Sequence, residues 1–393
     1  MKKNAPSGVV CNTIYRKYTH TMDAKPSLIY TLTALVAVSF FATLTRATTI
    51  DVIVTFDYPL RNTLATLPQK IEDQTDLVGT FIRGDGTEEG FIYKPLVPTF
   101  SPPIIPPFAN GGPTQGRGIN FRRHVVGEYL NQSDGTFHGY LMTHPKCTPT
   151  PTPTPSGMPG GLARETGTDS SFADGPDSRG TGCPLVFSAF DVVGASDTIP
   201  LGINNLGDIV GSAVFPDGTQ PAFLSVKRGV TTFAVPDATA TFAYQINDSG
   251  QITGYYLDAD GKSHGFMRDS AGALTFPIDV VGATDTFLLG NNASNWVVGK
   301  YTDALGVTHG LFYVTPDNIL TYDYPGAINT SLTGINKNSL ICGYYSDAAG
   351  ISHGFVARVN VTASGKPNMN ILHLPVKPLY TPPKVPGMSV PVF

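Results

Sequence analysis

Four histidines, each followed by glycine, are the residues whose types and spacing first suggest chemistry. They are His138, His264, His309 and His353. A repeated imidazole invites a metal-binding or catalytic interpretation, because histidine ligates metals and moves protons near neutral pH. These four occupy equivalent positions of separate repeats, however, and no His-x-x-x-His or Cys-x-x-Cys spacing occurs. The sequence therefore predicts a structural role, with each imidazole bonded to a neighbouring turn, and no metal site.

Two serines stand in a Gly-x-Ser-x-Gly pattern, at Ser263 and Ser352. A nucleophile elbow needs this pattern between a strand and a helix. Here the pattern runs from a turn into a strand, and sister copies carry Thr308 or Phe137 in the serine position. The pattern thus belongs to the repeat, and the sequence predicts no catalytic residue and no cofactor.

Aspartate and asparagine recur at positions that suggest turns. Asp258, Asp303 and Asp347 each begin an Asp-x-x-Gly segment. Short polar side chains there bond to the backbone two residues on, and the segments lack the dense acidic pattern of a calcium loop. The same chemistry predicts turns, or contacts that lock neighbouring repeats, for a set of asparagines: Asn204, Asn247, Asn292 and Asn336.

These residues belong to a unit that occurs six times. Tyr244–Phe266 shows it most clearly: polar turns separate segments rich in β-branched and aromatic residues, and Val230–Pro236 supplies one more strand upstream. The copies align on one glycine, and the last four of these are 43, 45 and 44 residues apart: Gly79, Gly127, Gly211, Gly254, Gly299 and Gly343.

A fixed period of this length predicts a repeat architecture, because one unit cannot bury its apolar faces alone. Four short strands in about 44 residues match one propeller blade. We therefore expect an all-β fold, a β-propeller of about six four-stranded blades. An elongated β-solenoid is the alternative, but its coils are shorter and its strands parallel, whereas the tight turns favour antiparallel neighbours.

The repeated motif resembles the extracellular repeats called the HAF family, whose own motif ends in His-Ala-Phe. The matching segments are Gly202–Asn204, Gly334–Asn336, His264–Phe266 and His353–Phe355. Glycine stands here where the family more often has alanine. The resemblance covers about residues 50–358 and implies an exported protein with a β-rich fold. It carries no established catalytic residues.

The composition of the chain limits the classes of binding partner that are expected. Hydrophobic residues make up 41% of the chain and charged residues 14%, with a net charge of −4. This balance provides no basic surface for nucleic acid and too little acidity to indicate a basic partner. A polysaccharide or a surface protein is the expected partner, and the protein is expected to be a monomer.

Residues 1–47 predict an export signal. Basic residues precede an apolar run at 28–44, and small residues follow near Ala47. An uncleaved anchor is the alternative, because the run is at the lower limit of the length that spans a bilayer. Membrane association is expected only through that uncleaved leader.

The repeat domain is expected at 48–375, with a Pro/Gly-rich insert at 145–184 that interrupts the period. Cys147 and Cys183 flank this insert, so a disulfide across its base is plausible in an oxidising compartment. A strand near 370–375 is expected to close the ring of blades by pairing with the first blade. Residues 376–393 are expected to form a Pro-rich tail.

Positions where the copies differ are free of the demands of the fold and are therefore candidates for binding. Trp296, the only tryptophan, stands where other copies have turn residues. His124 holds the same position in the second unit, behind Arg122 and Arg123. An exposed aromatic with cationic neighbours suits a sugar or an aromatic ligand. Packing in the core is the alternative for Trp296.

The sequence thus predicts an exported, non-catalytic β-propeller that binds a ligand or partner at a loop-lined face, secreted or on the surface of a bacterial cell. One alternative is an extracellular carbohydrate-active hydrolase or lyase with carboxylates on variable loops. A second alternative is a structural surface protein.

Overall fold

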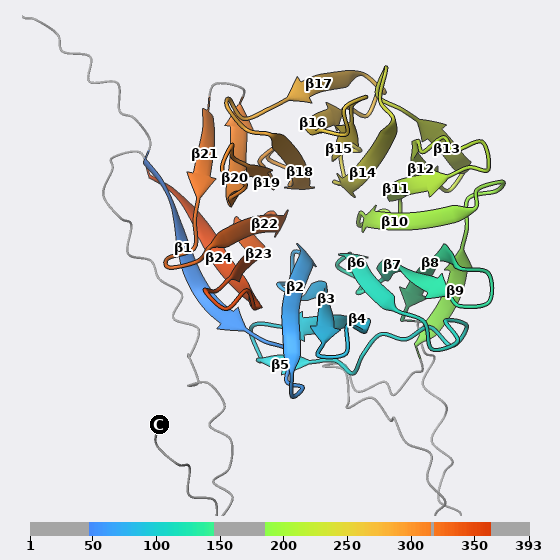
Figure 1. Cartoon of the computed structure of the whole chain (residues 1–393), viewed down its shortest axis with the longest axis horizontal. Coiled ribbons are helices and arrows are strands. Elements are labelled where there is room, and N and C mark those ends of the chain that lie inside the picture. The colour runs from blue at the N-terminus through green and yellow to red at the C-terminus, as the bar shows by residue number, and fades with distance from the viewer. Residues whose placement is uncertain (1–46, 145–184, 316–317, 363–393) are drawn as a thin grey trace, which may run out of the picture. The chain divides into compact units, whose positions relative to one another are not determined.

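The computed structural model describes residues 47–144, 185–315 and 318–362. This part of the chain contains 24 strands and no helix, which confirms the all-β prediction. Figure 1 shows the strands arranged as sheets around a common centre. Within the described residues, no helix is long and apolar enough to cross a membrane.

Four sheets have four antiparallel strands each, in chain order. The first comprises β6 (Thr114–Ile119), β7 (Val125–Asn131), β8 (Thr136–Thr143) and β9 (Val186–Phe190). The second comprises β10 (Asp197–Ile203), β11 (Ile209–Val214), β12 (Ala222–Val226) and β13 (Gly229–Phe233). The third comprises β14 (Ala240–Ile246), β15 (Ile252–Leu257), β16 (Ser263–Arg268) and β17 (Leu274–Ile278). The fourth comprises β18 (Asp285–Asn291), β19 (Val297–Thr302), β20 (Thr308–Thr315) and β21 (Asn318–Tyr322).

A fifth sheet has eight strands and unites the two ends of the described chain. From the C-terminal end come β22 (Asn329–Ile335), β23 (Leu340–Ser346) and β24 (Ser352–Thr362). From the N-terminal end come β1 (Ala47–Phe56), β2 (Thr63–Ile71), β3 (Leu77–Arg83), β4 (Glu88–Lys94) and β5 (Thr99–Phe100). The two groups meet at β2 and β24, which are parallel and joined by the single pair Ala65 and Ser352.

The predicted count of about six separate four-stranded blades is not supported by this division into sheets. Four four-stranded sheets and one eight-stranded sheet are present. The physical reason is the backbone pairing at Ala65 and Ser352, which joins the first and last units of the chain edge to edge.

The sheets follow one another in a circle. Each unit contributes one strand to an inner ring, and each of these strands packs against the next. In order they are β2, β6, β10, β14, β18 and β22, and β22 packs against β2. These innermost strands therefore surround the centre of the fold, as Figure 1 shows. The arrangement is propeller-like.

The sequence unit and the sheet are offset by one strand. The segment Val230–Pro236, which opens one unit, contains β13, and β13 pairs with β12 of the preceding unit. By the same rule β1, which opens the first unit, pairs along its length with β24 of the last, from Ala47–Thr362 to Phe56–Gly354. Closure in the described structure thus comes from the N-terminal strand.

The recurring glycine on which the copies align has a packing cause. At Gly254 a Cβ would lie 2.0 Å from the carbonyl oxygen of Phe242 and 2.8 Å from the ring of Phe266. The ring of Phe266 is fully buried on the neighbouring strand. Glycine therefore lets an aromatic side chain of the third strand lie flat across the second, which builds the core of each sheet.

Several predictions fall outside the described residues. These are the export signal at 1–47 except for its last residue, the insert at 145–184 with Cys147 and Cys183, the closing strand near 370–375 and the tail at 376–393.

Candidate functional site

Arg122, Arg123 and His124 lie at the turn between β6 and β7. Nε of Arg123 is 2.6 Å from Oδ2 of Asp76, and the guanidinium of Arg122 stands 5.3 Å from the ring centre of Phe121. Partial burial lowers the pKa of His124, and the nearby Arg122 and His144 act in the same direction. Arg123 is thus engaged in a contact between neighbouring turns, and Arg122 is exposed.

Trp296 lies at the equivalent turn between β18 and β19. Its indole is partly buried against a hydrophobic cluster and meets the ring of Phe312 edge-on, with centroids 5.7 Å apart. No hydrogen bond, ion pair or ring contact described in the structure joins Trp296 to the residues near His124, and their sheets are not neighbours. The binding role of this set stays a prediction, and packing accounts for much of the Trp296 side chain.

The asparagines at these turns link one sheet to the next. The Oδ1 atom of Asn247 accepts hydrogen bonds from the backbone nitrogens of Ser249 and Gln251, which closes the turn. The side-chain nitrogen then donates to the backbone oxygen of Asn292 on the next sheet, at 3.1 Å. The same donation runs through the series Asn120, Asn204, Asn247, Asn292 and Asn336. This confirms the predicted role as turn and locking residues.

The series ends at Glu72. Nδ2 of Asn336 donates to its backbone oxygen at 3.0 Å, and the Glu72 carboxylate accepts from the nitrogens of Gln74 and Asp76 as an asparagine would. A carboxylate has no N–H group with which to continue to Asn120. Burial raises the pKa of Glu72 to about 7, although the two backbone hydrogen bonds act to lower it.

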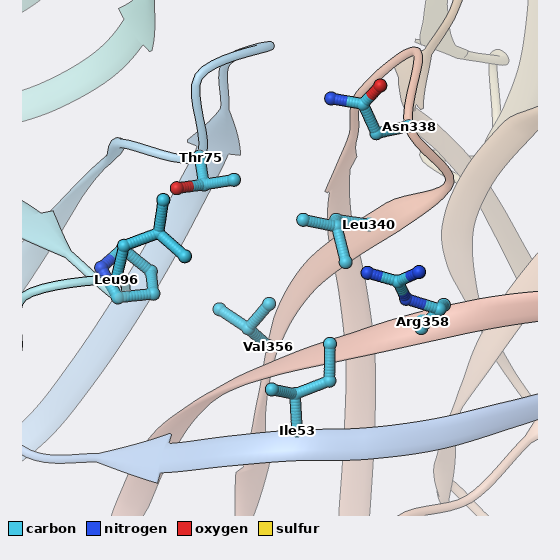
Figure 2. A pocket seen from close by; sticks show the side chains of 8 residues that line it. Ile53, Thr75, Leu96, Asn338, Leu340, Val356 and Arg358 are labelled. Atoms are coloured by element: carbon cyan, nitrogen blue, oxygen red, sulfur yellow. The ribbon is translucent and has the colours of Figure 1, made fainter. Parts of the chain in front are cut away.

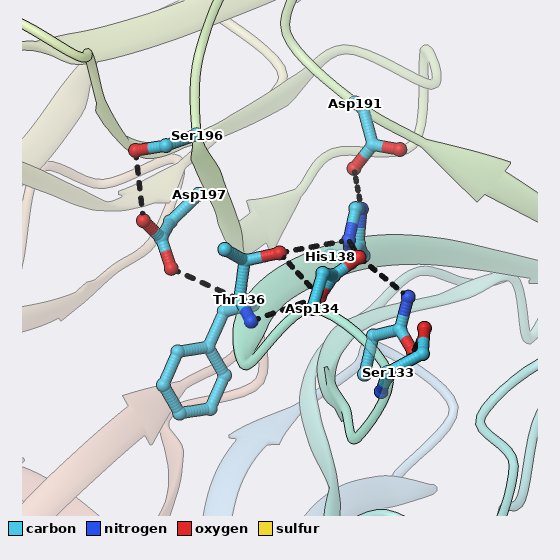
Figure 3. Close-up of polar contacts among 9 residues, drawn as sticks. Ser133, Asp134, Thr136, His138, Asp191, Ser196 and Asp197 are labelled. Atoms are coloured by element: carbon cyan, nitrogen blue, oxygen red, sulfur yellow. Dashed lines mark hydrogen bonds and ion pairs between the residues drawn. The ribbon is translucent and has the colours of Figure 1, made fainter.

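The four repeated histidines each bridge two aspartates. His264 bonds through Nδ1 to Asp279 at 2.9 Å and through Nε2 to Asp258 at 3.2 Å. Figure 3 shows the copy at His138, whose nitrogens face Asp191 and Asp134. Partial burial acts to lower the pKa of these imidazoles, but the carboxylates outweigh it and the net shift is upward. The predicted bond to a neighbouring turn is confirmed.

This geometry also disfavours a metal. Each imidazole bonds through its two nitrogens to two separate carboxylates. A metal site would need carboxylate oxygens that converge on an ion bound by one of these nitrogens, and the carboxylates here lie at opposite nitrogens. Within the described residues no group of three or more His, Cys, Asp or Glu is placed to hold an ion. The glycine after His264 serves packing, since a Cβ on Gly265 would lie 2.8 Å from Cγ of Leu288.

A groove of about 430 Å³ lies where the two halves of the eight-stranded sheet meet. Its wall is mostly apolar, with Ile53, Leu96 and Val356, and Arg358 stands beside them (Figure 2). Arg358 is the only charged residue in the lining. The groove therefore offers shape and apolar surface, with little polar chemistry to orient a ligand.

Convergent polar groups are found instead at the centre of the fold. Each innermost strand contains a bulge, which re-aims a side chain relative to the pleat. The bulged residues are Gln69, Arg117, Leu201, Tyr244, Leu289 and Thr333. The Tyr244 hydroxyl donates to Oε1 of Gln69 at 2.5 Å, although β14 and β2 are three places apart in the circle. The side chains of Tyr244 and Gln69 therefore meet across the centre.

Two cations at the centre are already engaged. Nζ of Lys70 donates to the backbone oxygen of Ile203 at 2.8 Å, and burial lowers the pKa of this lysine to about 8. Arg117 donates through Nε and Nη2 to Oε1 of Glu128, at 2.9 and 2.7 Å. Burial raises the pKa of Glu128, and Arg117 opposes this effect. Oε2 of Glu128 is buried and has no hydrogen-bond partner among the described residues.

An aromatic surface is formed by side chains of β14, β15 and β18. Phe242 stacks on Tyr255 with centroids 4.7 Å apart, and Tyr255 meets Phe287 edge-on at 4.9 Å. Nζ of Lys300 lies 4.8 Å from the centre of the Phe287 ring. Burial raises the pKa of Tyr255 and Arg117 acts to lower it, so the aromatic surface is within electrostatic reach of the ion pair.

We call this group the axial site. Its members come from β6, β7, β14, β15, β18 and β19: Arg117, Glu128, Phe242, Tyr255, Phe287 and Lys300. The three aromatic residues, Arg117 and Lys300 are partly exposed, whereas Glu128 is 3% exposed. Small-ligand sites are usually lined by aromatic side chains together with a few fixed polar groups.

Sequence reasoning missed the axial site, although a signal was present. Copies differ at the bulged position, where Gln69, Arg117 and Tyr244 align, just as they differ at Trp296. Of these, only Arg117 belongs to the axial site, and the aromatic members lie within strands, where aromatic residues are usually packing.

The described chain is thus an all-β, propeller-like fold with polar and aromatic side chains gathered at its centre. No family model matches the sequence, and no curated protein matches it.

Some solved structures are similar to this chain at low sequence identity. A streptogramin B lyase is 9% identical, covers 80% of this chain and 98% of its own, and has a TM-score of 0.40. A lectin from Aleuria aurantia in complex with alpha-methyl-L-fucoside is 11% identical, with 79% and 98% covered and a TM-score of 0.43. A gluconolactonase from Xanthomonas campestris is 9% identical, with 79% and 95% covered and a TM-score of 0.42. No argument about function follows from similarities at this level.

Proposed function

We propose that this protein is a non-catalytic binding scaffold whose axial site takes a carbohydrate ligand. The observation that carries this proposal is the contiguous aromatic surface of Phe242, Tyr255 and Phe287, with the ammonium of Lys300 over the last ring. Partly exposed aromatic rings with a polar group beside them suit a ligand that has both an apolar face and polar groups.

A sugar suits this site. The C–H face of a pyranose packs on aromatic rings, and its polar substituents interact with charged side chains at the edge of such a surface. Tyr255 is held by contacts to Phe242 on its own sheet and to Phe287 on the next. The surface is therefore preorganised, which reduces the entropy lost on binding.

We also propose that the fold is a six-bladed propeller. In this interpretation the eight-stranded sheet is two blades, one of β2 to β5 and one of β22 to β24 with β1. Support comes from the single residue pair between β2 and β24, against at least five pairs between most neighbouring strands of a blade. Support also comes from the six innermost strands that pack in sequence around the centre.

Export to the cell exterior and membership of the HAF family are part of the same proposal. Their support is the resemblance of the repeated segments, such as His264–Phe266, and the leader pattern of the first 47 residues. A location outside the cell fits a carbohydrate ligand.

Glycan retention tests the proposed function. The full mature chain is offered a panel of soluble and insoluble polysaccharides, and retention and new reducing or unsaturated ends are recorded in the same tubes. We expect retention that Tyr255→Ala reduces at least tenfold and that Trp296→Ala leaves unchanged.

The matched pair of variants decides where the ligand lies. Loss with Trp296→Ala alone would move the site to the turn that the sequence predicted. New chain ends would show that the protein is an enzyme, which overturns the non-catalytic part of the proposal. No retention of any glycan would overturn the carbohydrate ligand.

A further inference from the structure

We propose that the axial site selects sugar units that carry a carboxylate, with Lys300 as the counter-ion. This inference rests on the proposed function, because it assumes that the axial site binds carbohydrate. It adds the charge of the ligand and the orientation in which the ligand lies.

Lys300 differs from Arg117 and Lys70 in its contacts. Arg117 is paired with Glu128, and Lys70 is buried against the backbone of Ile203. Lys300 forms no ion pair or hydrogen bond within the described residues, and its ammonium lies over the ring of Phe287. It is partly exposed, so its charge is available to a ligand that rests on the aromatic surface.

The fold itself does not require this charge. Lys300 follows the aligned glycine of its unit, and the five other units place uncharged residues or Glu128 there: Thr80, Glu128, Ser212, Tyr255 and Tyr344. Each of these residues pairs with a partner on the innermost strand, as Lys300 pairs with Phe287. A lysine at one copy of a repeated position therefore indicates a role outside packing.

The aromatic surface and the ammonium together orient the ligand. Tyr255 and Phe242 present the flat surface on which a sugar ring rests. Phe287 meets Tyr255 edge-on and lies under the ammonium of Lys300. An acidic sugar unit on this surface would thus lie with its carboxylate toward Lys300.

The test uses sugars that differ only in charge. Oligosaccharides of galacturonate, glucuronate and mannuronate are each compared with their methyl esters by calorimetry, using the full mature chain. We expect at least one acid to bind about tenfold more tightly than its ester, a difference of about 1.4 kcal/mol. Raising the salt concentration should reduce this difference.

Variants at Lys300 locate the source of the preference. Lys300→Met keeps the aliphatic stem and should abolish the difference in affinity between the acid and its ester. Lys300→Arg keeps the charge and should retain the preference. Tyr255→Ala should weaken the acid and its ester alike.

The outcomes separate the inference from the proposed function. Equal binding of acids and esters, or a preference that survives Lys300→Met, overturns the selection by charge and leaves a carbohydrate site standing. If no acidic or neutral sugar of the panel binds, the proposed function is wrong and the inference falls with it.

Discussion

At the scale of single residues, Glu72 is the point where a repeated interaction is interrupted. Five asparagines close their own turns and donate to the next sheet, and Glu72 does only the first of these. Its side chain is nevertheless buried, with 4% of its surface exposed. The first unit thus carries an acid where the geometry of the other units suits an amide.

Glu72→Asn should stabilise the protein. The amide can close the turn and also donate toward the backbone of Asn120, and it removes a buried carboxylate. The pKa of Glu72 is raised to about 7, so its proton binds more tightly in the folded state. Stability is therefore lost as the pH rises from the ordinary glutamate value through about 7. We expect a gain of about 1 kcal/mol at pH 5 and a larger gain at pH 8, measured by urea unfolding.

Asp260→Asn is the control for this prediction, because it removes an exposed carboxylate from another turn. It should change the free energy of unfolding by less than about 0.5 kcal/mol at either pH. A Glu72→Asn protein that is no more stable than the parent at pH 8 would contradict the argument.

At the scale of elements, the histidine bridges tie each third strand to its neighbours. His264 lies on β16 and bonds to Asp258 in the turn before this strand and to Asp279 after β17. Tyr256 stacks on the imidazole, with centroids 5.2 Å apart. The same set recurs at His309. These bridges hold the connections between strands, outside the hydrophobic core.

The bridges should make stability depend on pH. Because the folded pKa of each bridging histidine is raised, its contribution is complete below the ordinary value near 6.5 and is lost as the pH rises through the raised value. The pKa of Asp258 is lowered, mainly by the backbone hydrogen bond from Lys262, so its contribution is lost as the pH falls through the lowered value. Stability should therefore be highest between these two limits.

Replacing all four bridging histidines by glutamine should flatten the fall in stability between pH 6 and 8. Solvent screens these part-exposed pairs, so we expect about 0.3 kcal/mol from each, measured by urea unfolding across that range. His124→Gln is the control, because the pKa of His124 is lowered and its contribution has the opposite sign. An unchanged pH profile in the fourfold variant would refute the role of the bridges.

At the scale of the whole molecule, β1 joins the two ends of the described chain. It pairs with β24, and its Phe56 stacks on Tyr93 of β4 with centroids 4.2 Å apart. Phe56 is 7% exposed and its ring occupies the space beside Gly354. One side chain thus contacts both halves of the eight-stranded sheet.

Phe56→Ala should therefore destabilise the entire fold. Removing a buried aromatic side chain costs about 3–5 kcal/mol, and here the cavity opens at the junction that closes the circle. Thermal unfolding should remain a single transition at a lower temperature. The control is Phe137→Ala, since Phe137 is 36% exposed and should matter little. Equal losses in the two variants would show that β1 does not close the fold.

Much of this architecture could be predicted from the sequence, because it repeats and is local. The strands and turns around Tyr244–Phe266 follow from β-branched and aromatic runs between Asp and Gly turns, and each copy confirms the next. The roles of His264 and Asn247 could also be predicted, since their nearest partners lie in turns a few residues away.

Only the tertiary structure decided how the units are cut into sheets and what meets at the centre. A periodic sequence does not say whether its first strand pairs forward or backward, so the pairing of β1 with β24 follows from closure of the circle. The contact of Tyr244 with Gln69 joins residues 175 positions apart. Such a contact depends on how many units fill the circle and on the direction in which each bulge turns its side chain, and neither quantity is encoded in any single unit.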